Sequence, residues 1–214
     1  MYIPKHFEEP KVDAMHELMH AHPLATLVTL SSEGLNANHI PLLLSPEPVP
    51  YGTLQGHVAR SNPVWTDFAK DTEVLAIFNG PEHYITPSWY ATRQETGKVV
   101  PTWNYISVHA YGALRVVDDP AWLRSQLAAL TGQNETGFAE PWKVTDAPHD
   151  YTEKLIGSIV GIEIVITKLQ GKWKLSQNQP AQNRGGVIAG LESVGTEQAR
   201  EMAESIARAE KDIR

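Results

Sequence analysis

The distribution of apolar and polar residues predicts a protein built mainly from β-strands. Runs in which β-branched and apolar residues alternate with polar ones recur from Leu24 to Ser176. Short turns, among them 31–34, 79–81 and 170–171, separate these runs, so neighbouring strands are expected to pair as antiparallel hairpins. The predicted strands are 24–30, 36–44, 53–57, 73–79, 83–86, 105–117, 160–168 and 172–176.

Further segments carry helix signals. Asn62 and Asp119 precede prolines, as expected at two helix starts. The predicted helices are 12–20, 63–70, 120–130, 149–156 and 196–213. Strands that come as hairpins with helices between them indicate an α+β, mainly β class, with an antiparallel sheet or barrel. Because no repeat or long linker is visible, we expect one domain over 1–214, with a C-terminal helical extension from about 180 to 214.

Composition excludes several classes of protein. The 214 residues include no cysteine, so disulfides and cysteine zinc clusters are excluded. No run approaches the roughly 20 apolar residues of a membrane span, and the N-terminus has no secretory signature. The formal net charge is −7 and no basic stripe is visible, so direct DNA binding is disfavoured. We expect a cytoplasmic protein without a membrane segment.

One formal metal motif is present, in which His16 and His20 flank Glu17 as in H-E-x-x-H. The predicted helix ends before Pro23, and no downstream pattern supplies a third ligand. Leu18 and Met19 between the histidines are typical of the buried stripe of a short covering helix. We therefore predict no metal, and a zinc metalloprotease is the least favoured function.

Three other candidate ligand sites are present. Arg60 lies between a strand end and the helix start at Asn62, an arrangement that suits a phosphate but also suits an ordinary capped helix. The aromatic segments 83–90 and 100–105 could form the wall of a planar ligand or simply a packed core. Lys174 and Ser176 share one strand face, which indicates either an anion site or a solvated edge strand.

Six segments, taken together and in order, resemble the PaiB family of FMN-binding negative transcriptional regulators. They are MYIPKHF from Met1, GHVARSNPVW from Gly56, YITPSWY from Tyr84, VPTWNY from Val100, VGIEI from Val160 and KWKLSQN from Lys172. The resemblance covers nearly the whole chain. It implies an antiparallel split β-barrel of the FMN-binding type with peripheral helices, related to the pyridoxamine-phosphate-oxidase-like flavoproteins. It further implies a homodimer with FMN in grooves at the subunit interface.

The resemblance also implies which residues approach the flavin. Arg60 and Ser61 are the residues expected at the phosphate, whereas Gln179–Arg184 departs from the family pattern and is given no site. The full predicted cofactor-binding set is Asn38, His39, Ile40, Pro41, His57, Val58, Ala59, Arg60, Ser61, Asn62, Trp103, Asn104, Lys174 and Gln177.

Several functions remain open on the sequence. Bound FMN would supply redox chemistry, with the chain as an oxidoreductase, although no catalytic acid or base is identified. A regulator would act through an unknown small molecule or protein partner, since no helix-turn-helix pair is visible. Haem binding or degradation is the alternative, because some related split barrels handle haem and His or Tyr can serve as axial ligands.

Overall fold

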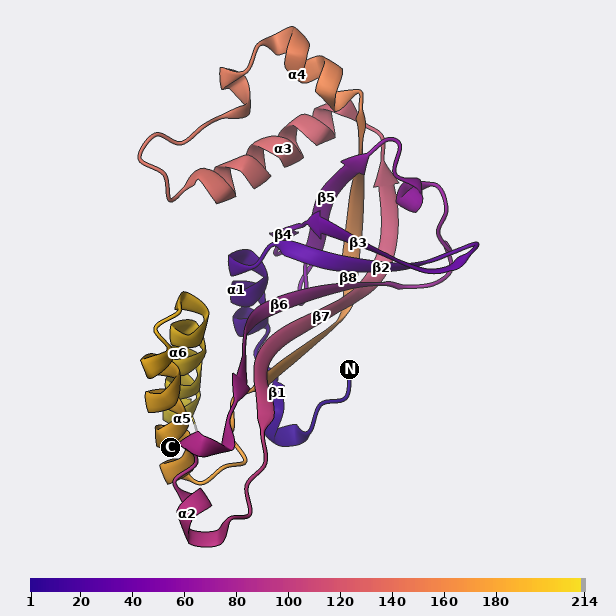
Figure 1. The fold of residues 1–214 in the computed structure, drawn as a ribbon. Helices are drawn as coiled ribbons and strands as arrows, with labels where there is room; N and C mark the ends of the chain where they lie inside the picture. Colours follow the sequence, from indigo (N-terminus) through magenta and orange to yellow (C-terminus); the bar gives the residue numbers. More distant parts are fainter. Residues whose placement is uncertain (213–214) are drawn as a thin grey trace. The chain divides into compact units, whose positions relative to one another are not determined.

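The computed structural model describes residues 1–212, which form two compact units (Figure 1). The barrel unit consists of Val12–Phe78 and His109–Leu169. The helical unit consists of Met1–Lys11, Asn79–Val108 and the described chain from Gln170 onward. Strands β6, β7 and β8 contribute residues to both units, and the single-domain assignment stays a prediction.

One sheet runs in the order β3-β2-β6-β7-β8-β5-β4, and each described register between its strands is antiparallel. β3 and β4, the two ends of this order, are separated in the chain only by Leu42, so the sheet closes on itself as a barrel. The short β1 (Glu8–Glu9) pairs with β8. The other strands are β2 (Leu24–Ser31), β3 (Gly34–Pro41), β4 (Leu43–Ser45), β5 (Thr53–Ala59), β6 (Val74–Ile85), β7 (Thr102–Val117) and β8 (Ile159–Lys174).

Alternate residues of the strands form the barrel core. On β2, Ala25 and Leu27 are fully buried, whereas Leu24 and Leu30 are exposed. β5 pairs with β8 so that Leu54 lies opposite Ile164, and both side chains are fully buried. Since successive side chains on a strand point to opposite faces, each strand has one face toward this core.

Six α-helices lie within residues 1–212. They are α1 (Val12–Ala21), α2 (Thr92–Thr96), α3 (Pro120–Glu135), α4 (His149–Ile156), α5 (Ala181–Val194) and α6 (Glu197–Asp212). Asp119 caps α3, because its Oδ1 accepts a 2.8 Å hydrogen bond from Ala121 N. None of the helices in this part of the chain is long and apolar enough to cross a membrane.

The predicted helices at 12–20 and 149–156 are confirmed, and α3 extends five residues beyond its predicted end at 130. The C-terminal extension is helical but begins with α5, which the sequence prediction did not delimit. A short helix, α2, lies in a segment for which neither a helix nor a strand was predicted. The predicted end of the last helix at Ile213 lies outside the described residues.

Two predicted hairpins were wrong. Residues 73–86 and 160–176 were each split at a turn, but β6 and β8 run through those positions as single strands. In β8, Gly171 pairs with Glu9 of β1, so the sheet ladder continues where Gly suggested a turn. The predicted strand 36–44 is interrupted at Leu42, between β3 and β4.

The predicted helix 63–70 was also wrong, because only a 3₁₀ turn at Pro63–Trp65 forms. Asn62 caps it as predicted, with its Oδ1 accepting from Val64 N. Beyond the turn, tertiary hydrogen bonds replace helical ones: Asp67 accepts from the backbone N and hydroxyl of Ser32, and Ala69 N donates to Leu30 O. These bonds hold the segment against the β2–β3 hairpin.

Candidate functional site

A row of amide side chains connects β3 to the turn that follows β5. Asn62 Nδ2 donates to Asn38 Oδ1 at 2.9 Å, and Asn38 Nδ2 donates to Asn36 Oδ1 at 3.2 Å. Asn62 Oδ1 in turn accepts from Val64 N at 3.0 Å. Two of the predicted flavin segments, which are far apart in the sequence, are therefore in direct contact. We call Asn36, Asn38 and Asn62 the amide row.

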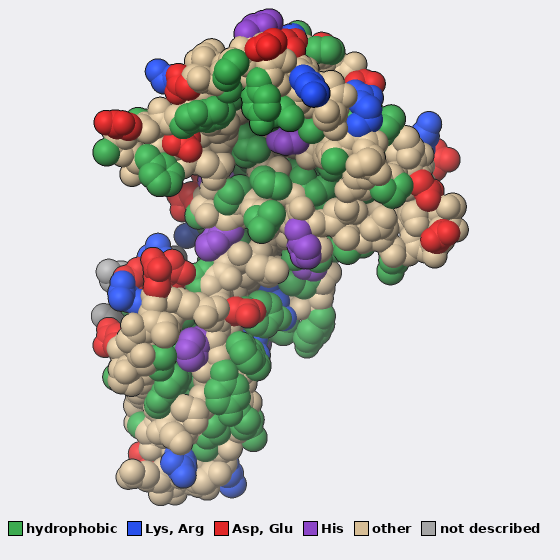
Figure 2. Space-filling view, turned by 45° about the horizontal axis from the view of Figure 1, so that its top comes forward, with side chains coloured by type: hydrophobic (Ala, Val, Ile, Leu, Met, Phe, Trp, Pro, Cys, Tyr) green, Lys and Arg blue, Asp and Glu red, His purple; other side chains and the backbone are tan. Residues whose placement is uncertain are grey.

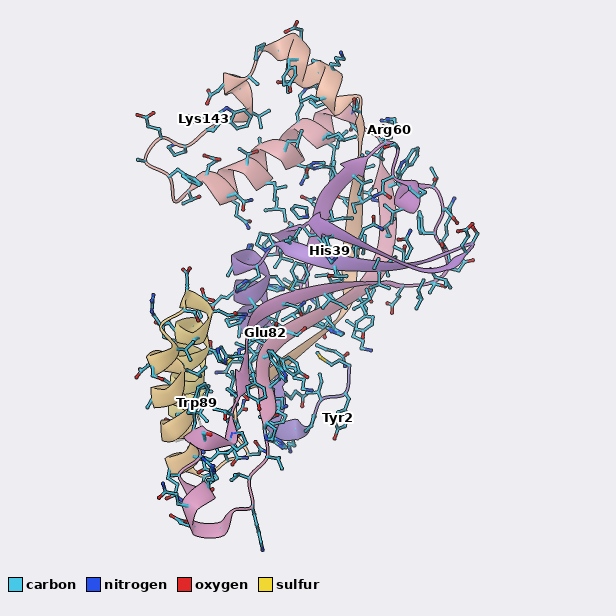
Figure 3. The ribbon with its side chains drawn as sticks, viewed as in Figure 1. Tyr2, His39, Arg60, Glu82, Trp89 and Lys143 are labelled. Atoms are coloured by element: carbon cyan, nitrogen blue, oxygen red, sulfur yellow. The ribbon has the colours of Figure 1, made fainter. Side chains whose placement is uncertain are left out.

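The predicted residues of β3 divide between its two faces. Asn38 is half-buried and Ile40 is buried on the inner face, whereas His39 and Pro41 are exposed on the outer face. His39, labelled in Figure 3, forms a 3.1 Å hydrogen bond through Nδ1 with Thr26 Oγ1. This alternation means that the four consecutive residues 38–41 do not all face one ligand.

The predicted residues of β5 divide in the same way. Val58 is buried in the core, while His57 and Ala59 lie on the other face. His57 Nδ1 lies 2.9 Å from Gln126 Oε1 on α3, so the ring N–H donates a hydrogen bond to this nearly fully buried amide. The imidazole of His57 is thus oriented by α3.

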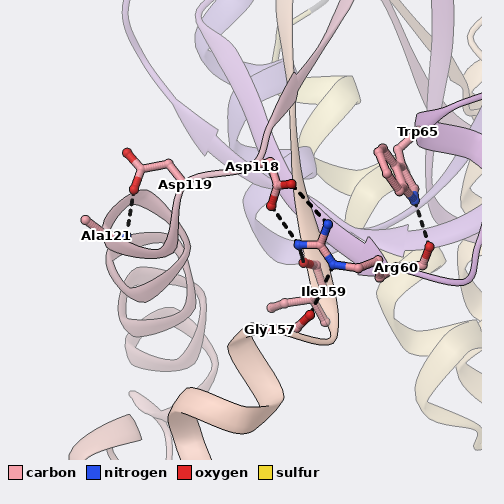
Figure 4. Close-up of polar contacts among 7 residues, drawn as sticks. All are labelled: Arg60, Trp65, Asp118, Asp119, Ala121, Gly157 and Ile159. Atoms are coloured by element: carbon pink, nitrogen blue, oxygen red, sulfur yellow. Dashed lines mark hydrogen bonds and ion pairs between the residues drawn. The ribbon is translucent and has the colours of Figure 1, made fainter.

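Arg60 is fully engaged within the barrel unit (Figure 4). Its guanidinium makes two hydrogen bonds to Asp118, at 3.0 and 2.6 Å, and donates to the carbonyl oxygens of Gly157 and Ile159 at 3.1 Å each. Trp65 Nε1 donates to Arg60 O at 3.0 Å. The hydrogen bonds between Arg60 and Asp118 raise the pKa of the guanidinium and lower that of the carboxyl.

The remaining four predicted residues lie in the helical unit, where three have clear partners. Asn104 is fully buried and its amide exchanges hydrogen bonds with the Ser176 hydroxyl at 3.0 and 3.2 Å. Lys174 Nζ donates to Thr102 Oγ1 at 2.7 Å. Gln177 folds back on its own turn, since its Oε1 accepts from Leu175 N and its Nε2 donates to Trp173 O.

The fourth, Trp103, is half exposed and meets Tyr84 edge-on, with 6.0 Å between ring centroids. Nearby in the same unit, Trp89 packs against α5, where a Cβ at Gly190 would lie 2.3 Å from its ring (Figure 3). The aromatic segments thus contribute both a packed core and an exposed pair.

The sequence analysis missed a buried carboxylate under α3. Glu163 on β8 is 7% exposed and accepts hydrogen bonds from Gln55 at 3.0 Å, from Trp122 at 3.1 Å and from Arg115. A single acid inside the apolar stretch 160–166 was the available signal, because a buried charge needs partners. Asp118 and Gln126, which hold Arg60 and His57, carried no comparable signal.

The histidine motif on α1 has a structural contact. His16 Nε2 lies 3.0 Å from Tyr51 O, and no group of three or more His, Asp or Glu suited to a metal occurs in residues 1–212. The absence of bound zinc stays a prediction.

The residues around the amide row suit a flavin nucleotide in their chemistry. The amides offer neutral donors and acceptors of the kind that pair with a flavin's pyrimidine edge, and Ser61 is exposed beside Arg60. A phosphate at Arg60 would share the guanidinium with Asp118. The turn at Pro63–Trp65 is too short to contribute a helix dipole.

Comparison with known proteins bears on this reading. Residues 1–168 match the family model described as "Putative FMN-binding domain". An uncharacterised protein of Emericella nidulans is 38% identical over 232 residues, covering 92% of each chain. The "Protease synthase and sporulation protein PAI 2" of Bacillus subtilis is 31% identical over 204 residues, covering 95% of each chain.

Among solved structures, the flavocytochrome Anf3 of Azotobacter vinelandii matches with a TM-score of 0.60 at 11% identity, over 80% of this chain and 72% of that one. At this identity the likeness bears on the fold alone. It confirms the predicted antiparallel split β-barrel with peripheral helices.

Proposed function

Since the chain belongs to the PaiB-like family of FMN-binding proteins, with FMN as its cofactor, we propose that it holds the flavin at the amide row and uses it for redox chemistry. One observation carries the location: Asn38 and Asn62, from two segments that the family resemblance assigns to the flavin, are hydrogen-bonded at 2.9 Å. Bound FMN supplies hydride and single-electron transfer, while the chain supplies binding and orientation.

In this proposal the residues of the barrel unit have separate tasks. The amides of Asn38 and Asn62 orient the polar edge of the ring, and Arg60 with Ser61 holds the phosphate. Asp118 fixes the direction of the Arg60 guanidinium, because two parallel hydrogen bonds determine the plane of the group. Gln126 orients His57 in the same region.

We also propose a homodimer, formed through the outer face of the β2–β3 hairpin. This face is exposed or half-buried, and it contains no Asp, Glu, Lys or Arg. Its members are Leu24, Thr26, Val28, Leu30, Leu35, Ala37, His39 and Pro41. In a twofold interface each patch meets its own copy, so an uncharged patch avoids repulsion even in a chain of net charge −7. A second copy of the chain is therefore the partner that we expect for this face. We also expect the protein to be cytoplasmic.

Regulation of transcription is the second candidate, supported by the family resemblance. It would proceed through a small molecule or a protein partner, since Lys and Arg are scattered on the face seen in Figure 2 rather than gathered into a basic stripe. Haem is the alternative ligand, and the absorption spectrum of the purified protein distinguishes it from FMN. Oxidised flavin bands support the proposal, and a Soret band would replace FMN with haem.

Titration of FMN and riboflavin against Arg60→Ala, Arg60→Lys and Asp118→Asn tests the phosphate contact. A charge-assisted bidentate contact predicts that Arg60→Ala weakens FMN by about tenfold to a hundredfold and leaves riboflavin nearly unchanged. Arg60→Lys should recover part of the loss, because an ammonium lacks the planar fork. Asp118→Asn is the matched control, since it removes the charge of the partner and keeps its shape.

The two ligands separate binding from structure. Equal weakening of FMN and riboflavin by Arg60→Ala would mean that Arg60 supports the fold through Asp118, Gly157 and Ile159 rather than the phosphate. An unchanged affinity for both ligands would place the phosphate elsewhere, and Lys174 would be the next residue to test.

A further inference from the structure

A pocket of about 150 Å³ lies within the helical unit. Its wall is formed by Phe7, Tyr90 and the segments 100–104 and 174–179. Four segments that are distant in the sequence thus meet around one space. The volume corresponds to about five water molecules, and it is smaller than the roughly 300–1,000 Å³ of pockets that enclose drug-sized ligands. A whole flavin nucleotide does not fit within this volume, so a ligand enclosed by the pocket would be a smaller molecule.

The polar part of the pocket is positively charged. Lys174 is half-buried and donates to the neutral Thr102 hydroxyl at 2.7 Å. No Asp or Glu lines the pocket, and no carboxylate in residues 1–212 forms an ion pair with Lys174. Burial lowers the pKa of the ammonium, which is the effect expected of a cation without a compensating charge. An anion in the pocket would supply that charge.

A second polar group in the wall lacks a partner. Tyr90 lines the pocket and only 4% of the residue is exposed, but its hydroxyl is not among the fully buried polar atoms and forms no hydrogen bond within residues 1–212. Burial raises the pKa of this phenol, so the group stays protonated and can donate. A hydroxyl of a pocket residue that has no partner in the protein can donate to a ligand with an acceptor oxygen.

Two of the lining residues, Asn104 and Ser176, are hydrogen-bonded to each other. Asn104 is fully buried and paired with the Ser176 hydroxyl, which itself is 3% exposed. Ser176 has a φ of +64°, in the left-handed region that residues other than glycine rarely occupy. Such strain persists only where surrounding contacts hold the backbone in place, so the lining does not collapse into the space.

The wall also has an apolar part, formed by three residues, besides the polar side chains of Asn178 and Gln179. Phe7 is buried, and Val100 and Pro101 are exposed beside the opening. Inorganic phosphate would leave these surfaces uncovered, whereas a carboxylate with a short hydrocarbon tail would match both parts of the wall. We propose that this pocket binds a small monocarboxylate, whose carboxylate meets Lys174 and Tyr90 and whose tail lies against the apolar wall. The proposal is independent of FMN binding and assigns Asn104 and Lys174 to a different ligand.

Isothermal titration at constant ionic strength tests the proposal with acetate, butyrate, pyruvate and benzoate. Butyramide is the uncharged counterpart of butyrate, and inorganic phosphate is the purely polar anion. The variants are Lys174→Met and Tyr90→Phe, with Lys168→Met as the matched control. Lys168 is an exposed lysine of the same strand, lies in the barrel unit and does not line the pocket. FMN affinity is measured on the same samples.

The wild type and Lys168→Met should bind at least one of the four carboxylates with saturation, and butyramide and phosphate should bind more weakly. Lys174→Met should lower carboxylate affinity by tenfold or more, and Tyr90→Phe by about threefold to tenfold, with FMN affinity unchanged. If Tyr90→Phe does not fold, the comparison of Lys174→Met with Lys174→Arg tests the proposal, because only Lys174→Arg keeps the charge.

Three results would overturn the proposal. They are no saturable binding of any of the four carboxylates, equal affinity in Lys174→Met and Lys168→Met, and equal binding of butyrate and butyramide. Loss of FMN affinity in Lys174→Met with carboxylate binding intact would return Lys174 to the flavin site. Loss of FMN affinity in the Arg60 variants alone leaves the pocket unaffected, so the two proposals fail separately.

Discussion

Replacement of Gly161 by alanine should destabilise the protein by about 2–3 kcal/mol, a figure that follows from the space beside β8. A Cβ at this position would lie 2.4 and 2.8 Å from Trp122 Cζ3 and Cε3, and 2.8 Å from Val117 O. Ordinary contacts begin at 3.4 Å, so the indole must move by about 1 Å. Because Val117 O is backbone, a side-chain rotation alone cannot relieve all of the overlap.

The cost has two parts and one offset. Overpacking a well-packed site costs about 1–3 kcal/mol. Moving the indole also stretches its 3.1 Å hydrogen bond to the buried Glu163, which adds about 1 kcal/mol. The smaller conformational freedom of alanine in the unfolded chain returns about 0.4–1 kcal/mol. For a chain of this size, the balance lowers the melting temperature by about 4–12 °C.

Thermal unfolding of Gly161→Ala and Gly132→Ala provides the assay. Gly132 lies in α3 with open space around its Cβ position, so the same change there should raise the melting temperature by a few degrees. In a Trp122→Phe background, which removes the indole benzo ring, the loss caused by Gly161→Ala should shrink. An unchanged loss in that background, or equal melting temperatures for the two alanine variants, would refute the assigned contact.

Three other predictions follow from single residues. Glu163→Ala should cost about 3–4 kcal/mol in chemical denaturation because Trp122 and Gln55 lose their acceptor, and Glu163→Gln, which keeps one acceptor, should cost about half. Burial lowers the pKa of His109, so the neutral imidazole contributes stability above the unfolded-state pKa of about 6.5, and this stability is lost as the pH falls below that value. In His109→Gln the melting temperature should therefore decline less steeply between about pH 7 and 5 than in the wild type. An equally steep decline in the two proteins would contradict this prediction. Light scattering of the wild type should give about twice the 23.7 kDa chain mass. Leu35→Glu should give monomers, whereas Leu155→Glu, which changes an exposed leucine on α4, should remain a dimer. A monomeric wild type that binds FMN tightly would rule out the dimer.

The sequence predicted most strands and helices because local pattern decides those elements. The hydrophobic stripe of α1 and the Asp119 cap of α3 are local signals, and both helices form there. The prediction failed at Gly80 and Gly171, where turn residues lie within long strands. Ladder hydrogen bonds to partners remote in the sequence, such as Glu9 for Gly171, decide the structure at those positions.

The candidate site depended still more on remote partners. The sequence offered Arg60 and Lys174 as two candidate anion receptors, and the family resemblance favoured Arg60 with Ser61 for the phosphate. In the structure Arg60 meets Asp118, 58 residues away, while Lys174 meets only the Thr102 hydroxyl and the π face of Tyr105 among described residues. A guanidinium with a carboxylate partner is already neutralised, and an incoming phosphate must compete for it.

The Lys174 ammonium lies among neutral groups, so no carboxylate competes with an incoming anion. The anion therefore gains the whole electrostatic attraction to the ammonium, reduced only by the cost of desolvation. The neighbours of each cation therefore decide its availability more than its position beside a strand end or a turn. On this ground Lys174 is the more available cation within its own unit, whereas a phosphate held by Arg60 shares the guanidinium with Asp118. The proposed phosphate contact still requires Arg60→Ala to weaken FMN and to leave riboflavin nearly unchanged, and loss of a carboxylate in Lys174→Met would show that Lys174 receives a different anion.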